Sequence, residues 1–177
     1  ELSGEILTPE GEIFSPGGLL NQVDLGGEGQ GGNLTIETRH LSISNGSKVQ
    51  VATFGEGNPG ELLIRASEVD VFNTPNASNR FTTGIFAGIL QDPRIQELPT
   101  GQETKLTIYA ERLSIRGGAE VSAETSGIGN GGDLFIQVED LVEVEGTNRF
   151  GSPSFLGSEV NPPSPVTPIS PEEITGK

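Results

Sequence analysis

Four charged side chains in this sequence could in combination perform acid–base chemistry: Glu68, Asp70, Glu111 and Arg112. Paired carboxylates cleave glycosidic bonds when they lie roughly 5–10 Å apart across the bond. Sequence spacing does not distinguish these side chains from the solvated charges that cover the outer face of any folded chain. We therefore assign them no catalytic role, and carbohydrate cleavage stays the alternative interpretation.

His40 is the only histidine, and the chain has no cysteine. A histidine cluster or a thiolate set, the usual ways to hold zinc, is therefore excluded. A serine hydrolase triad would depend on His40 alone, and no Gly-x-Ser-x-Gly elbow accompanies any serine. We expect His40, beside Arg39, to be a surface turn residue. No catalytic, cofactor-binding or metal-ligating residue is assigned.

Gly-x-Gly-x-x-Gly occurs three times, starting at Gly27, Gly55 and Gly127. A dinucleotide site needs a helix directly after the glycines, whereas each of these motifs precedes an alternating, strand-like segment. We expect tight turns instead. The segment 129–133, Gly-Asn-Gly-Gly-Asp, is similar to calcium-binding glycine-rich loops but lacks their nine-residue repetition, so a weak calcium site there stays open.

The elements that carry these residues follow a repeat. Four similar segments begin Asn-Leu-Thr-Ile, Glu-Leu-Leu-Ile, Lys-Leu-Thr-Ile and Asp-Leu-Phe-Ile, and their leucines stand 28, 44 and 28 residues apart, at Leu34, Leu62, Leu106 and Leu134. The long interval predicts an insertion between about residues 73 and 104. Because insertions in solenoids often carry recognition, this loop is a candidate for ligand contact, although a plain covering role is favoured.

Each repeat contains three short segments with a period of two residues, which indicates strands. The third segment is expected to align Ile13, Val49, Ile85 and Val121, each 36 residues apart, with a partial relative at 154–157. Inward side chains are then Leu34, Ile36, Leu41, Ile43, Val49 and Val51, and outward ones are Thr35, Glu37, Ser42, Lys48 and Gln50. Small side chains at Thr38, Ala66, Ala110 and Val138 indicate a coil corner.

Strand triplets of this kind bury their apolar side chains when each coil pairs with the next. The sequence thus predicts an all-β fold, a right-handed parallel β-helix of four to five coils with three short strands each. We place a partial leading coil or extended segment at 1–10, the β-helix at 11–156, and a disordered, proline-rich linker or tail at 157–177. Asn79-Arg-Phe recurs as Asn148-Arg-Phe, so Phe81 and Phe150 are expected to pack on the flank.

Composition limits the possible partners. The formal charge of −15, from 25 acidic and 10 basic residues, disfavours nucleic acid and anionic membranes. No run of apolar residues reaches the length of a transmembrane helix, and no charged-then-apolar leader is recognised at Glu1. Because the sequence does not begin with Met, the chain is interpreted as an excerpt. Asn33, Asn45 and Asn76 lie in Asn-x-Ser/Thr sequons, which are interpreted as turn and strand residues.

The sequence resembles the repeat region of filamentous haemagglutinin-like exoproteins, particularly the large cyanobacterial ones, over roughly residues 11–156. The resemblance lies in Gly-Gly-Asn-Leu-Thr-Ile at 31–36, Leu-Ser-Ile at 113–115, Gly-Ala-Glu-Val-Ser-Ala at 118–123 and Gly-Asn-Gly-Gly-Asp-Leu at 129–134. It implies export by two-partner secretion through an outer-membrane transporter. The secretion domain of that family and an Arg-Gly-Asp motif are not evident here.

From the resemblance we expect a secreted or cell-surface structural or adhesion module that lacks catalysis and cofactors. Its partners would be a host or neighbouring cell surface, extracellular matrix or polysaccharide. The alternative is a carbohydrate-active β-helix enzyme, similar to polysaccharide lyases or hydrolases with a pectin lyase-like fold.

Overall fold

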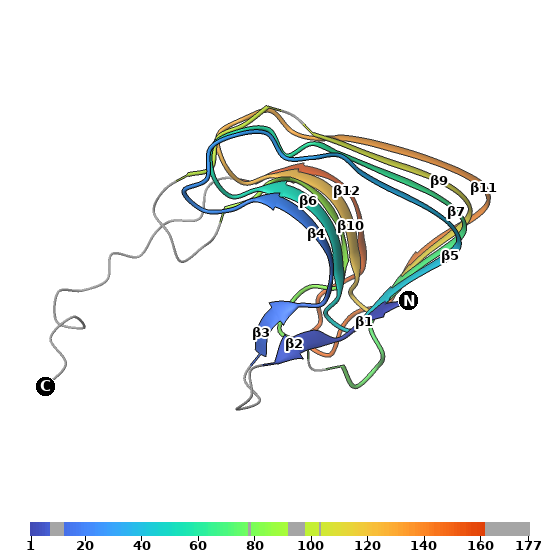
Figure 1. Ribbon diagram of the computed structural model, residues 1–177. Coiled ribbons are helices and arrows are strands. Elements are labelled where there is room, and N and C mark those ends of the chain that lie inside the picture. The colour runs from blue at the N-terminus through green and yellow to red at the C-terminus, as the bar shows by residue number, and fades with distance from the viewer. Residues whose placement is uncertain (8–12, 78, 92–97, 103, 162–177) are drawn as a thin grey trace, which may run out of the picture.

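The computed structural model describes residues 1–7, 13–77, 79–91, 98–102 and 104–161, and its regular elements there are all strands. Two five-stranded parallel sheets make up most of it, together with one antiparallel hairpin. From β4 onward, successive strands alternate between the two sheets, so the chain winds as a β-solenoid (Figure 1). The expected all-β stack of parallel coils is confirmed.

The first sheet contains the long strands and the short β1. Its order is β1 (Leu2–Ser3), β5 (Leu34–Ser44), β7 (Glu61–Phe72), β9 (Lys105–Arg116) and β11 (Asp133–Glu145). The order of the second sheet is β12 (Phe155–Val160), β10 (Glu120–Thr125), β8 (Gly84–Ile89), β6 (Lys48–Thr53) and β4 (Gly18–Val23). The hairpin joins β2 (Glu5–Leu7) to β3 (Ile13–Pro16).

The leucine repeat is confirmed as the register of the first sheet. Leu34 pairs with Leu62, Leu62 with Leu106, and Leu106 with Leu134. Because the side chains of a strand alternate between its two faces, this register puts every aliphatic column on the inner face. Ile43, Ile64, Ile108 and Ile115 are completely buried in the resulting core.

The prediction of three strands per coil needs correction, since each full coil has two. The first two predicted segments form one long strand that bends at its middle (Figure 1). At the bend of β5, β7 and β9 one residue in each strand is left out of the pairing: Arg39, Ser67 and Glu111. The small residues predicted for the corner, Thr38, Ala66, Ala110 and Val138, do lie in register there. The ladder continues in the same register after the bend from β5 to β9, whereas a bulge between Val138 and Leu141 shifts it by one residue at β11.

The first turn of the third column was also predicted wrongly. Val49, Ile85 and Val121 do pair, but their partner in the first coil is Leu19 of β4. Ile13 lies in the antiparallel hairpin instead. The 36-residue spacing between Ile13 and Val49 is a coincidence, because the connections between successive coils differ in length. At the other end, the partial relative at 154–157 does pair with β10, with Leu156 opposite Val121, and β12 runs to Val160.

The predicted insertion is divided into two parts on either side of β8. Three residues connect β5 to β6 but eleven connect β7 to β8, and seven connect β6 to β7 but fifteen connect β8 to β9. Each connection is therefore eight residues longer in the second coil. The first part is held by Asn73, whose Oδ1 accepts from Thr83 Oγ1 at 2.5 Å. Residues 92–97 and 103 of the second part lie outside the described residues.

In the recurring Asn-Arg-Phe triplets the asparagine side chains hydrogen-bond to the backbone, but only one of the two phenylalanines is partly buried. Asn79 Nδ2 donates to the carbonyl of Phe81, and Asn148 Oδ1 accepts from the amides of Phe150 and Ser152. Phe81 is half-buried, but Phe150 is 68% exposed and does not pack on the flank. Its ring lies instead under the Arg149 guanidinium, at 4.6 Å.

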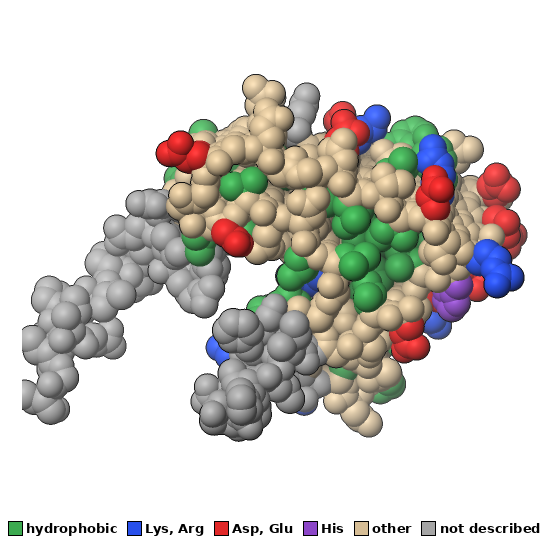
Figure 2. Space-filling view, in the orientation of Figure 1, with side chains coloured by type: hydrophobic (Ala, Val, Ile, Leu, Met, Phe, Trp, Pro, Cys, Tyr) green, Lys and Arg blue, Asp and Glu red, His purple; other side chains and the backbone are tan. Residues whose placement is uncertain are grey.

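The last coil leaves its inner side chains uncovered. Val142 and Val144 continue the columns of Leu113 and Ile115, yet they are 48% and 42% exposed. Apolar side chains are also visible at the end of the stack that faces the viewer in Figure 2.

The proline-rich region predicted as a linker lies, from residue 162, outside the described residues.

Candidate functional site

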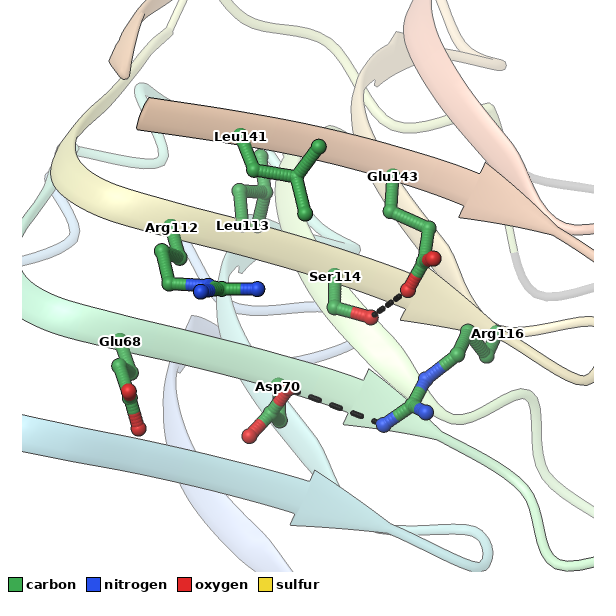
Figure 3. A pocket seen from close by; sticks show the side chains of 8 residues that line it. All are labelled: Glu68, Asp70, Arg112, Leu113, Ser114, Arg116, Leu141 and Glu143. Atoms are coloured by element: carbon green, nitrogen blue, oxygen red, sulfur yellow. Dashed lines mark hydrogen bonds and ion pairs between the residues drawn. The ribbon is translucent and has the colours of Figure 1, made fainter. Parts of the chain in front are cut away.

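The outer face of the long strands, beyond their bend, carries three of the four charged residues singled out in the sequence. Glu68 and Asp70 on β7 lie beside Arg112 on β9, because Glu68 pairs with Arg112 and Asp70 with Ser114. They line a shallow depression of about 250 Å³, shown in Figure 3. Arg116 and Glu143 complete its charged lining.

Within this depression the charges are largely paired. Arg116 Nη2 lies 3.8 Å from Asp70 Oδ1, and Ser114 Oγ donates to Glu143 Oε2 at 2.9 Å (Figure 3). Arg112 Nη1 lies 3.6 Å from Asp140 Oδ2. Such exposed pairs contribute little to stability, so the face is a polar surface available for contacts.

The fourth residue, Glu111, lies elsewhere. It stands at the bend and lines a second depression, whose other lining residues include Arg65 and Tyr109. Ser67 Oγ donates to Glu111 Oε1 at 3.3 Å, and the Arg65 guanidinium lies 4.8 Å from the Tyr109 ring. The four residues therefore do not line a single depression.

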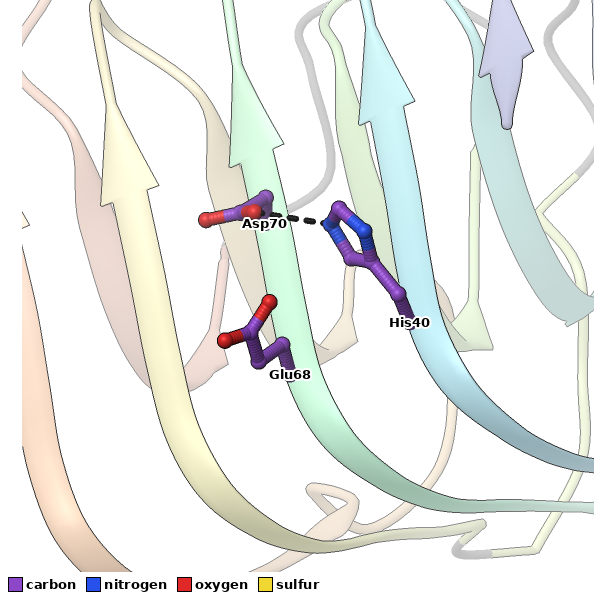
Figure 4. Close-up of side chains that lie close together, drawn as sticks. All are labelled: His40, Glu68 and Asp70. Atoms are coloured by element: carbon purple, nitrogen blue, oxygen red, sulfur yellow. Dashed lines mark hydrogen bonds and ion pairs between the residues drawn. The ribbon is translucent and has the colours of Figure 1, made fainter.

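His40 contacts the first group instead, which the sequence did not reveal. It lies in β5 and not in a turn, paired in register with Glu68. Its Nε2 is 2.9 Å from Asp70 Oδ2 (Figure 4). Ligand atoms of His40, Glu68 and Asp70 all lie within 4.8 Å of one another, and this is the group of three potential metal ligands found among the described residues. A 30-residue separation in the sequence gave no signal for it.

A second polar surface lies on the outer face of β4, β6, β8, β10 and β12, which curve as Figure 1 shows. Lys48 and Gln50 were expected to point outward, and they do alternate with the core residues Val49 and Val51. Gln50 is only 3% exposed, and its Nε2 donates to Gln22 Oε1 at 3.2 Å. Phe86, one coil further on, is 4% exposed. Part of this face is therefore shielded from solvent.

Burial changes the ionisation of the acids on this face. Burial raises the pKa of the Glu124 carboxyl to about 7, and the nearby Glu120 charge adds to the rise while Lys48 opposes it. Burial also raises the pKa of Glu120. The pKa of the Lys48 ammonium is lowered by burial, against the opposing effect of Glu124 and Glu120. A half-buried carboxyl with a pKa near neutrality is a candidate general acid.

The glycine motifs form turns, as expected, and no helix follows any of them in the described residues. Single-residue parallel bridges link Glu28 to Glu56, Glu56 to Thr100, and Thr100 to Ile128, so the corner near Pro99 keeps its place despite its different sequence. The two sequon asparagines Asn33 and Asn45 bond to the next coil, through the amides of Glu61 and Thr74. Asp133, at the end of the calcium-like loop, belongs to no potential ligand group found among the described residues.

Comparison with known proteins adds no relative. No protein-family model, no curated protein and no solved structure matches this chain. Within the residues described, no helix is long and apolar enough to span a membrane.

Proposed function

We propose that this chain is a structural or adhesion module of a large exported surface protein of the filamentous haemagglutinin type. In this proposal the coils wind right-handed, as crossover connections between parallel strands almost always do, and the bent long strand with its following short strand makes three sides. The parent protein would leave the cell by two-partner secretion through an outer-membrane transporter and act at the cell surface, on a neighbouring cell, matrix or polysaccharide.

One observation carries the proposal: inner positions are held constant from coil to coil while outer positions vary. The column that contains Ile36 and Ile64 continues as Ile108 and Ile136. On the outer face, His40 is followed by Glu68 and Arg112 at the same register. A scaffold needs this combination, because the constant interior supplies rigidity and the variable exterior supplies recognition.

A glycan array probed with the chain, alongside degradation assays on acidic polysaccharides, tests the proposal. Saturable binding to a defined glycan class without cleavage supports an adhesion module. A blank array with no cleavage supports a structural spacer. Cleavage of polysaccharide by the purified chain contradicts the proposal and supports the alternative below.

The alternative function, a carbohydrate-active enzyme, is favoured by the acids of the second sheet. Glu124 pairs in register with Glu159, which puts two carboxyl groups on adjacent strands of one outer face. The pKa of Glu124, raised to about 7, keeps it partly protonated near neutral pH, as a general acid requires. If the chain cleaves polysaccharide, Glu124→Gln should abolish the release of products, and Glu37→Gln on the other sheet should leave it unchanged.

A further inference from the structure

The cluster of His40, Glu68 and Asp70 has the composition of a metal site. His40 and Glu68 occupy the same register position on β5 and β7, and Asp70 stands two residues beyond Glu68 on the same face (Figure 4). We propose that these three residues bind a divalent transition-metal cation of the Zn²⁺ type, which links two adjacent coils of the solenoid.

The distances suit one ion. Zinc binds histidine nitrogen and carboxylate oxygen at about 2.0–2.2 Å, so two ligand atoms of one ion lie about 3.0–3.6 Å apart at the usual angles. His40 Nε2 and Asp70 Oδ2 stand 2.9 Å apart, so they need to separate only slightly to reach this range. All three ligand atoms fall within 4.8 Å of one another, so a small rotation of the exposed Glu68 side chain completes the set. Water would fill the remaining coordination positions.

The ligand types select the class of metal. An imidazole nitrogen favours Zn²⁺, Cu²⁺ and Ni²⁺, whereas Ca²⁺ and Mg²⁺ favour oxygen ligands alone. His40 is the only histidine and the chain has no cysteine, so no stronger nitrogen or thiolate ligand competes elsewhere in it. In the free protein His40 Nε2 and Asp70 Oδ2 are in hydrogen-bond contact at 2.9 Å, and a metal ion bound by both atoms replaces this contact.

The neighbouring arginines set the strength of the site. Arg116 lies against Asp70 Oδ1, which leaves Oδ2 facing His40. This contact orients the carboxylate, as outer contacts of metal ligands commonly do. Arg112, opposite Glu68, is drawn toward Asp140 on β11. Because both guanidinium groups repel a cation, we expect weaker binding than at a closed four-ligand zinc site.

Titration of the chain with ZnCl₂ tests the proposal, with two readouts. Calorimetry should give one equivalent per chain. The imidazole signals of His40 should shift or broaden in NMR spectra, and they need no assignment because no other histidine is present. His40→Gln, Glu68→Gln and Asp70→Asn should each weaken binding at least tenfold.

Glu143→Gln is the matched control. It removes one negative charge from the same depression but no proposed ligand, so Zn²⁺ affinity should change by less than about twofold. The proposal is overturned if millimolar Zn²⁺ gives no saturable binding, if His40→Gln binds like the unaltered chain, or if Glu143→Gln weakens binding as much as Asp70→Asn. Tighter binding of Ca²⁺ than of Zn²⁺ at these residues also overturns it. Circular dichroism confirms that each exposed variant stays folded.

Discussion

The ammonium nitrogen of Lys48 lies 4.6 Å from the centre of the Phe86 ring, one coil further along the second sheet. Lys48 is in register with Gly84, whose missing side chain leaves room for the Phe86 ring to lie flat on the sheet. The cation therefore rests on an aromatic face, with the carboxylates of Glu120 and Glu124 near it. This arrangement of opposite charges in a covered place makes stability depend on pH.

The first prediction concerns Glu124. Its pKa is raised from 4.5 to about 7 by folding, so between these values the folded chain holds more protons than the unfolded chain. The contribution of Glu124 to stability is therefore full below pH 4.5 and is lost as the pH rises through 7. Glu124→Gln should remove this loss. The free energy of unfolding of the variant, compared with that of the unaltered chain, should be about 1–3 kcal/mol higher at pH 8 than at pH 5.

Urea unfolding of both proteins at pH 5, 6, 7 and 8 measures this effect. Glu37→Gln is the control, because Glu37 is exposed on the other sheet. If the free energies of unfolding of the unaltered chain and of Glu124→Gln change with pH in parallel, the pKa of the Glu124 carboxyl is not raised and the prediction fails. Glu120, whose pKa is also raised by burial, should give a change of the same sign when replaced by glutamine.

The second prediction concerns Lys48. Its positive charge lowers the pKa of Glu124 against the larger effect of burial. Lys48→Gln should therefore move the Glu124 titration upward, which ¹³C NMR of the side-chain carboxyl detects. Lys105→Gln, at an exposed position on the first sheet, should leave that titration unchanged. An unchanged Glu124 titration in Lys48→Gln would contradict the prediction, because it would show that the charge is too distant to act.

The inner face of each strand could be predicted from the sequence much better than the outer face. The leucine repeat predicted the register of the first sheet as far as the bend of β11, because inward side chains must match from coil to coil to fill a shared core. Beyond that bend a bulge between Val138 and Leu141 shifts the pairing by one residue. The third column was misaligned at Ile13, because the antiparallel hairpin interrupts the repeat before β4. Register was thus predictable where the core enforces it and not beyond its end.

Outer contacts were not predictable in the same way. Glu68, Asp70 and Arg112 came together because register placed them side by side, but the contact of His40 with Asp70 is diagonal and depends on side-chain rotamers. Periodicity identifies which side chains point outward, not which of them are covered. The burial of Gln50 and Phe86 therefore had no signal in the repeat.

The third prediction compares two neighbouring residues of β7. Ile64 is completely buried, whereas Leu63 points to the other face and is only half-buried. Ile64→Ala should destabilise the chain by about 2–5 kcal/mol, since it leaves a cavity between two coils. Leu63→Ala removes a similar volume and should cost less than about 1.5 kcal/mol. Equal losses in urea unfolding would mean that the coil interior is not the main source of stability.

The last prediction separates close stacking of the coils from backbone strain at their glycine turns. Gly29 and Gly57 occupy equivalent turns with φ of 141° and 133°, values that residues with a side chain rarely adopt. A Cβ on Gly29 would meet open space, but a Cβ on Gly57 would collide with the carbonyl of Gly29 in the preceding coil. Gly29→Ala should therefore cost about 1 kcal/mol from strain alone. Gly57→Ala should cost a further 1–3 kcal/mol, because the two coils must move apart. Thermal unfolding of the two variants measures the difference, and the stacking argument fails if their midpoints coincide.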